Sequence, residues 1–174
     1  MEHMGITSAV AEHPASAAKR SRHPQVFLSF LPEDAAIGAV LLRELRKRHV
    51  RCWSAPASAT FSGAELPADI ARVLARSNCL IRICSAATRH STLMQMELTA
   101  FRALQASDAN DAQGGASGRR LLLELIADPA YVSDAPDETA QVTSALPPER
   151  TVTITIANRP ASAWMIGVLN ALGT

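Results

Sequence analysis

The chain alternates short apolar runs with longer segments in which apolar residues recur at helical spacing, and this alternation limits the possible folds most strongly. Strands that alternate with helices are joined by right-handed crossovers, which make the sheet parallel and place helices on both faces. The expected fold class is therefore α/β, with a five-stranded parallel sheet flanked by helices. We predict strands over 25–30, 50–53, 79–85, 120–126 and 151–156, and helices over 35–48, 66–74, 91–105 and 162–172.

One domain of ordinary size accounts for the chain. Its 174 residues are 48% hydrophobic, which is enough for a core of its own. Residues 1–24 are rich in Ala, Ser, His and Pro without apolar periodicity, so we predict a flexible leader there and a single domain over 25–174. Polar, low-complexity sequence at 106–118 and prolines mixed with aspartates at 127–149 predict two loops.

Charge, hydropathy and cysteine content argue against several kinds of partner. The formal net charge is +1, whereas nucleic-acid binding needs a clustered basic excess. No apolar run approaches the roughly 20 residues that span a bilayer. Cys52, Cys79 and Cys84 lie in apolar segments without a CxxC pair, so we expect reduced thiols, no metal site and a cytoplasmic location.

The motifs of common nucleotide-binding folds are missing where ligands bind to parallel sheets, beyond the carboxyl ends of the strands. The sequence has no GxxxxGK[ST] loop, and its glycines at 114, 115 and 118 follow a predicted helix instead of a strand. After the first strand, Leu31 and Pro32 replace a Ser/Thr/Gly phosphate loop, and Glu33 and Asp34 form the acidic start of a helix. Ser85 ends the third strand where a phospho-receiver domain would need an aspartate.

The predicted helix over 91–105 carries a carboxylate on its apolar side. At 100° per residue, Glu97 falls between Leu93 one turn before it and Phe101 one turn after it. An unpaired buried carboxylate is costly, so Glu97 should be paired, protonated or placed in a cleft. Two interpretations are open at this point. Glu97 either pairs with a buried arginine such as Arg82, or is a cleft carboxylate that stabilises a cationic transition state.

Three segments, taken in order, resemble the Toll/interleukin receptor (TIR) domain family of the bacterial type, over roughly residues 25–172. VFLSF followed by two acidic residues is similar to the family's first box. The loop from Ala55 to Gly63 resembles the second box, or BB loop. LIRICSAATRHSTLMQMELTAF resembles the segment in which a strand ending in serine leads to a helix with the motif's glutamate, and Ser91, Glu97 and Leu98 match in register. The resemblance implies a flavodoxin-like TIR fold.

The resemblance also implies an activity and a setting. In many members the glutamate at the position of Glu97 is the catalytic residue of NAD⁺ cleavage at the nicotinamide–ribose bond. The chain is accordingly expected to be an NAD⁺ glycohydrolase or cyclase, with NAD⁺ as substrate and no resident cofactor. Its expected product is ADP-ribose or a cyclic isomer. The expected role is bacterial defence or host-interaction signalling, in the cytoplasm or as a translocated effector. The alternative is a non-catalytic module that acts through self-association or contacts with other TIR domains at the 54–63 loop.

Further candidate residues lie near the ends of the first two strands and near Glu97. Phe30 and Trp53 can alternatively be core residues. We expect Ser29 and Ser85 to cap backbone groups, with substrate contact as a secondary role. His90 is expected to be an exposed residue at the helix start. The predicted substrate-binding residues are Ser29, Phe30, Leu31, Trp53, Phe61 and Leu93, and the predicted interface residues are Phe61 and Gly63.

Overall fold

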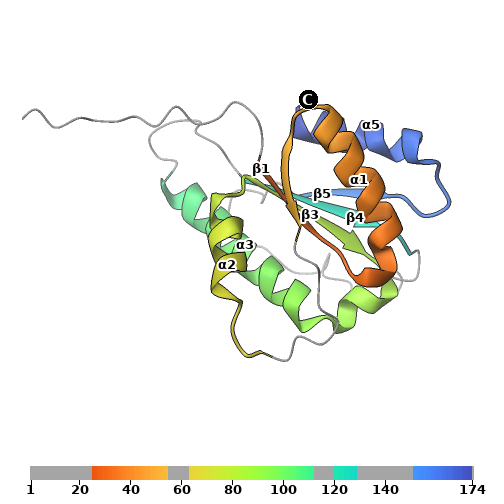
Figure 1. Cartoon of the computed structure of the whole chain (residues 1–174). Coiled ribbons are helices and arrows are strands. Elements are labelled where there is room, and N and C mark those ends of the chain that lie inside the picture. The colour runs from red at the N-terminus through yellow and green to blue at the C-terminus, as the bar shows by residue number, and fades with distance from the viewer. Residues whose placement is uncertain (1–24, 55–62, 112–119, 129–150, 174) are drawn as a thin grey trace, which may run out of the picture.

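A single parallel sheet organises the molecule. The computed structural model describes residues 25–54, 63–111, 120–128 and 151–173. Within them, five strands pair in parallel in the order β2-β1-β3-β4-β5 (Figure 1). This confirms the predicted α/β, flavodoxin-like fold with five parallel strands. The strands are β1 Gln25–Ser29, β2 Arg51–Ser54, β3 Cys79–Cys84, β4 Leu121–Ile126 and β5 Thr151–Thr155.

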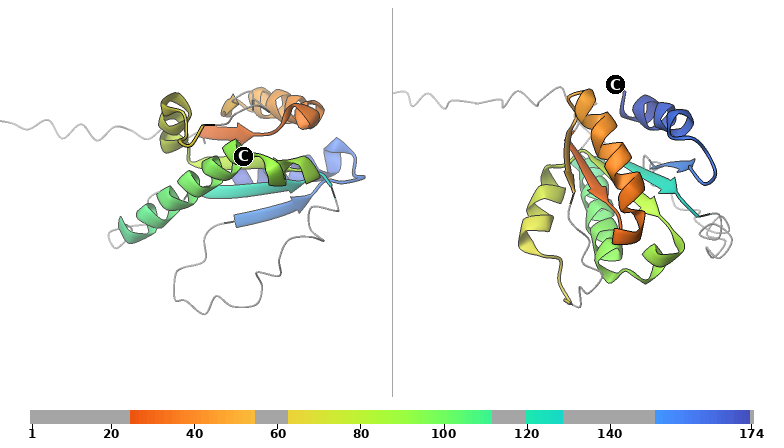
Figure 2. Two further views of the ribbon diagram at one scale, coloured as in Figure 1. Left: turned by 90° about the horizontal axis from the view of Figure 1, so that it is seen from below. Right: turned by 45° about the vertical axis from the view of Figure 1, so that its right-hand side comes forward.

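Helices cover both faces of the sheet. In Figures 1 and 2, α1 and α5 lie on one face, and α2 and α3 lie on the other. The described helices are α1 Ala35–Lys47, α2 Ala68–Arg76, α3 Thr92–Asp111 and α5 Ala161–Leu172, with short 3-10 helices η1 Pro32–Asp34 and η2 Ala86–His90. The two faces differ in the side chains they bury.

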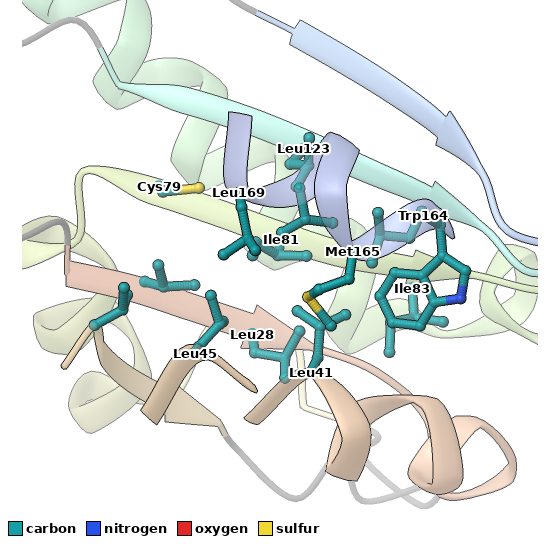
Figure 3. Close-up of a cluster of buried hydrophobic side chains, with 14 of the residues drawn as sticks. Leu28, Leu41, Leu45, Cys79, Ile81, Ile83, Leu123, Trp164, Met165 and Leu169 are labelled. Carbon is teal, nitrogen blue, oxygen red and sulfur yellow. The ribbon is translucent and has the colours of Figure 1, made fainter. Parts of the chain in front are cut away.

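The face under α1 and α5 holds a continuous apolar core, which we call the α1/α5 core (Figure 3). Alternate residues of β1, β3 and β4 point into it, because successive side chains of a strand face opposite sides of the sheet. Leu41 and Leu45 of α1 pack there and are fully buried. Burying side chains of this kind stabilises the fold by about 1.5–3 kcal/mol each. The residues drawn and labelled are Leu28, Leu41, Leu45, Cys79, Ile81, Ile83, Leu123, Trp164, Met165 and Leu169.

The face under α2 and α3 holds a second and smaller apolar cluster, the α2/α3 core. Phe27, Leu80 and Leu122 supply its floor from β1, β3 and β4. The helices contribute Ile70, Leu74, Leu93, Leu98 and Phe101. In β1, β3 and β4 these apolar residues lie before the carboxyl ends of the strands. Different side chains therefore occupy this face nearer to the carboxyl ends.

The helix boundaries differ most from the predicted ones in α2 and α3. Helix α2 begins at Ala68, because Pro67 is the extended residue before the helix and not part of its first turn. Helix α3 continues to Asp111, so the predicted loop over 106–118 is wrong for its first six residues. Residues 92–113 contain no glycine or proline, and alanine favours continuation of a helix.

Arg120 joins three elements at the amino edge of the sheet. Its Nε donates to the Ser77 carbonyl at 3.1 Å, and its Nη2 donates to the Ala75 carbonyl, just before the end of α2, at 2.9 Å. Its Nη1 pairs with Asp108 Oδ2 of α3 at 2.5 Å. Gln105 Nε2 in turn donates to the Arg120 carbonyl at 3.1 Å. The carboxyl-terminal part of α3 is therefore fixed to α2 and to the start of β4.

Several predictions concern segments outside the described residues. The leader over 1–24, most of the 54–63 loop and nearly all of the 127–149 loop lie there. Within the described ranges, none of the helices has the length and apolar character needed to cross a membrane.

Candidate active site

Polar side chains replace apolar ones toward the carboxyl ends of β1, β3 and β4 on the α2/α3 face. Strand alternation puts Ser29 on the same face as Phe27. In the sheet register, Ser29 lies opposite Arg82 of β3, and Arg82 lies opposite Glu124 of β4. We call these three residues (Ser29, Arg82 and Glu124) the polar row.

Glu97 of α3 joins this polar row. Its side chain is buried, with 2% of its surface exposed, as the helical spacing predicted. The Ser29 hydroxyl donates to Glu97 Oε2 at 2.5 Å. This hydrogen bond links β1 to α3 across 68 positions of sequence. The predicted role of Ser29 as a backbone cap is wrong, because its hydroxyl binds a carboxylate instead.

Arg82 is paired with a different carboxylate from the one that the sequence suggested. Its Nη1 lies 2.9 Å from Glu124 Oε1 in an ion pair. Arg82 is 1% exposed, whereas the side chain of Glu124 is 18% exposed. The positive charge still attracts the Glu97 carboxylate at longer range. Sequence reasoning overlooked Glu124, although it is the only charged residue within Leu121–Ile126.

The environment of Glu97 changes its protonation. Burial raises the pKa of Glu97 from its ordinary value of 4.5 to about 7. The hydrogen bond from Ser29 and the charge of Arg82 oppose this rise and favour the ionised form. At neutral pH the carboxyl group is thus present in both protonation states, and perturbed pKa values of this kind cluster at functional sites.

A second carboxylate is buried near the carboxyl edge. Asp34 of η1 accepts a hydrogen bond from the Ser85 hydroxyl at 2.8 Å. Burial raises the pKa of Asp34, while the hydrogen bond from Ser85 lowers it and the neighbouring Glu33 raises it. The sequence predicted Asp34 only as an acid at a helix start. Ser85 also forms a capping box with Thr88 at the start of η2, in which Thr88 Oγ1 accepts from the Ser85 N–H at 3.1 Å, so Ser85 takes part in the backbone cap that the sequence predicted.

Three predicted substrate-binding residues pack close to Glu97 or on the same face. Leu93 is buried in the α2/α3 core, one turn before Glu97. Leu31 is buried against Met94 of the same helix. Trp53 is half-buried on β2 and packs against Phe27, with ring centroids 4.8 Å apart and ring planes tilted by 40°. The structure therefore places Trp53 at the side of the α2/α3 core.

The other candidates lie elsewhere. The ring of Phe30 packs against the α1/α5 core, where its edge would lie 2.9 Å from a Cβ added at Gly38. Gly38 thus permits close approach of this ring to α1, and Phe30 is not brought together with Glu97. Phe61 lies outside the described residues, and Gly63 is exposed. His90 is exposed in η2 just before α3, as expected.

The described residues offer no ready metal ligands. In these parts of the chain, no group of three or more His, Cys, Asp or Glu side chains is arranged to hold an ion. The thiols of Cys79 and Cys84 are buried, and that of Cys52 is half-buried. Burial raises the pKa of Cys52 to about 11, so that this thiol stays protonated at neutral pH.

The chemistry available at this site is that of one carboxylate with a poised proton. An ionised Glu97 can stabilise positive charge that develops on a substrate, because a fixed charge in a dry site acts strongly. The Ser29 hydroxyl holds one carboxylate oxygen, Oε2, in place. Comparisons with protein-family models, with curated proteins and with solved structures find no match. Membership of the TIR family therefore stays a prediction.

Proposed function

We propose that this chain is a TIR-type enzyme that cleaves the nicotinamide–ribose bond of NAD⁺. The observation that carries the proposal is the buried Glu97 carboxylate, bonded to Ser29 at the carboxyl end of β1. This is the edge of a parallel sheet at which ligands bind. The helix position of Glu97 also matches the catalytic glutamate of the family that the sequence resembles. The chain would act in bacterial defence or host-interaction signalling.

The proposed mechanism uses Glu97 as an anion. Departure of neutral nicotinamide leaves positive charge on the ribose, in an oxocarbenium-like transition state. The Glu97 carboxylate stabilises that charge or holds the ribose hydroxyls, while Ser29 keeps the carboxylate in place. Nicotinamide is a good leaving group, so no strong general acid is required. Attack by water then gives ADP-ribose, and attack by a group of the same molecule gives a cyclic isomer.

The burial of Glu97 adds a condition to this mechanism. A carboxylate that is 2% exposed meets a substrate only after the surrounding side chains move. We therefore propose that the active form is an assembly of several chains, in which self-association supplies the opening. Activity should then rise more steeply than in proportion to protein concentration.

The test is nicotinamide release from NAD⁺ by the full chain over a wide range of protein concentration, with and without a crowding agent. Glu97→Gln should lower the rate by at least about 100-fold, because it removes the anion and keeps the shape. Glu44→Gln, which changes a partly exposed carboxylate of α1 that pairs with Lys47, is the matched control and should keep the wild-type rate. No release under any condition would overturn the proposal, and self-association without release would favour the non-catalytic interaction module.

A further inference from the structure

Arg82 is a buried cation whose hydrogen-bonding capacity is only partly used. It is the largest of the fully buried side chains and lies in the middle of the sheet, between β1 and β4. Its Nη1 is bonded to Glu124, but its Nε and Nη2 are buried without a hydrogen-bond partner among the described residues. A buried guanidinium with two unmet donors is unfavourable by itself. Packing therefore does not explain why an arginine occupies this position.

The placement of Arg82 brings one cation between two carboxylates. Ser29, its register partner on β1, is the residue that binds Glu97, and its register partner on β4 is Glu124. Arg82 pairs directly with Glu124 and attracts Glu97 at longer range. Since Glu124 is partly exposed and Glu97 is not, water can solvate Glu124 but leaves Glu97 dependent on the charge of Arg82.

Among the described residues, Ser29 and Arg82 are the groups that favour the ionised form of Glu97. Helix α2 presents the apolar Ile70 and Leu74 to the α2/α3 core. Cys84 follows Arg82 on the same face of β3 and is a buried thiol. Asp34, the other buried carboxylate, is bonded to Ser85.

Resting on the proposed function, we propose that Arg82 is the positioning residue for Glu97: held in place by Glu124, its guanidinium keeps Glu97 available as an anion in a site closed to water. Arg82 need not touch the substrate. Its positive charge raises the fraction of Glu97 that is ionised at a given pH, and the negative charge of Glu124 weakens this effect.

Opposite changes at Arg82 and Glu124 test this inference. Arg82→Met removes the cation, so the pH at which Glu97 ionises should rise by about one unit or more. Glu124→Gln removes the competing anion, so that pH should fall. Arg82→Lys keeps the charge and should stay near the wild-type value. If Arg82→Met alone does not fold, it is combined with Glu124→Gln, so that Glu124 is not left without its partner. In this double variant, Glu97 should ionise at a higher pH than in Glu124→Gln alone.

The first measurement needs no enzymatic activity. The free energy of unfolding in urea is measured between pH 4 and pH 9 for the wild type and for each Arg82 or Glu124 variant, once with Glu97 and once with Glu97→Gln. The pH dependence of the difference between the two free energies gives the pH midpoint of Glu97. The second measurement is the pH profile of nicotinamide release, whose acidic limb should move in the same direction as that midpoint. If Arg82 were only structural, replacing it would lower the free energy of unfolding. Arg82→Met and Glu124→Gln would then not shift the midpoint of Glu97, or the acidic limb, in opposite directions.

The outcomes separate this inference from the proposed function. Midpoints that stay at the wild-type value in Arg82→Met and in Glu124→Gln would overturn the role of Arg82, whether or not NAD⁺ is cleaved. Shifted midpoints in a protein that releases no nicotinamide would support the electrostatic link and overturn its catalytic use. Shifts in both measurements support the whole proposal.

Discussion

The two faces of the sheet are built from the same strands but bury different chemistry. On the α1/α5 face, β1, β3 and β4 present Leu28, Ile81 and Leu123 among other apolar side chains. On the α2/α3 face, the same strands present apolar residues first and then the polar row of Ser29, Arg82 and Glu124. The first face can stabilise the fold by burial alone, whereas the second must satisfy charges that it has removed from water.

The two faces therefore contribute to stability in different ways. A wholly apolar face tolerates no loss of volume but imposes no electrostatic demand. The mixed face gives up stability to keep Glu97 away from water, and its remaining stability depends on Ser29 and Arg82. Removing a buried apolar side chain from the first face should therefore lower the free energy of unfolding, whereas replacing Glu97 on the second face by a neutral residue should raise it.

The largest expected effect is on the α1/α5 face. Leu41→Ala should lower the free energy of unfolding by about 2–5 kcal/mol, because Leu41 is fully buried and its loss leaves a cavity. Urea denaturation at one pH measures this change. Ile166→Ala on the exposed side of α5 is the control and should change stability by less than about 0.5 kcal/mol. Equal effects of the two changes would contradict the assignment of this core.

The next effect has the opposite sign and belongs to the mixed face. The folded-state pKa of Glu97, about 7, exceeds its ordinary value of 4.5, so the folded state binds the extra proton between these pH values. The wild-type chain should therefore lose stability as pH rises through this window. Glu97→Gln does not titrate, so it should gain roughly 3 kcal/mol relative to wild type between pH 4 and pH 8.

Chemical unfolding at several pH values checks this gain, and Glu44→Gln serves as a control that should not reproduce it. The same Glu97→Gln chain should have lost nicotinamide release. A gap between wild type and Glu97→Gln that is constant with pH would show that Glu97 titrates normally.

A smaller effect concerns the hydrogen bond that holds Glu97. Ser29→Ala removes the buried donor and should lower stability by about 1–3 kcal/mol at neutral pH, because one carboxylate oxygen loses its partner. It should also raise the pKa of Glu97, since the bond from Ser29 favours the ionised form. The acidic limb of activity should then move to higher pH, and an unchanged limb would contradict this assignment.

The smallest effect is expected at the second serine–carboxylate pair. Ser85→Ala removes the donor to Asp34 and should cost about 0.5–1.5 kcal/mol. The pH profile of nicotinamide release should keep its wild-type acidic limb, because Asp34 is bonded to Ser85 and not to the Glu97 site. If the acidic limb in Ser85→Ala shifted as far as in Ser29→Ala, Asp34 and Glu97 would belong to one site.

The sequence predicted the order of strands and helices because periodicity is a local property. The same local reasoning placed Glu97 on the buried side of α3, between Leu93 and Phe101, which the structure confirms. The end of α3 is predicted too early for a local reason as well, since polar residues favour a loop although none of those up to Asp111 stops a helix.

The partners of these residues could not be predicted in the same way. That Ser29 binds Glu97, and that Arg82 binds Glu124 instead, depends on the register between strands that are far apart in the sequence. The sequence likewise predicts Asp34 only as part of an acidic helix start, because its partner Ser85 lies 51 positions away. Spacing along one element cannot reveal such contacts.

Arg120 gives α3 the mechanics of a lever. It anchors the helix at Asp108, 11 positions beyond Glu97, which is about 16 Å along the axis. If α3 moves to admit a substrate, this anchored end makes the motion a tilt and not a sliding of the whole helix. A tilt of about 10° then displaces Glu97 by about 3 Å over that arm, roughly the length of the hydrogen bond to Ser29 that it would have to break.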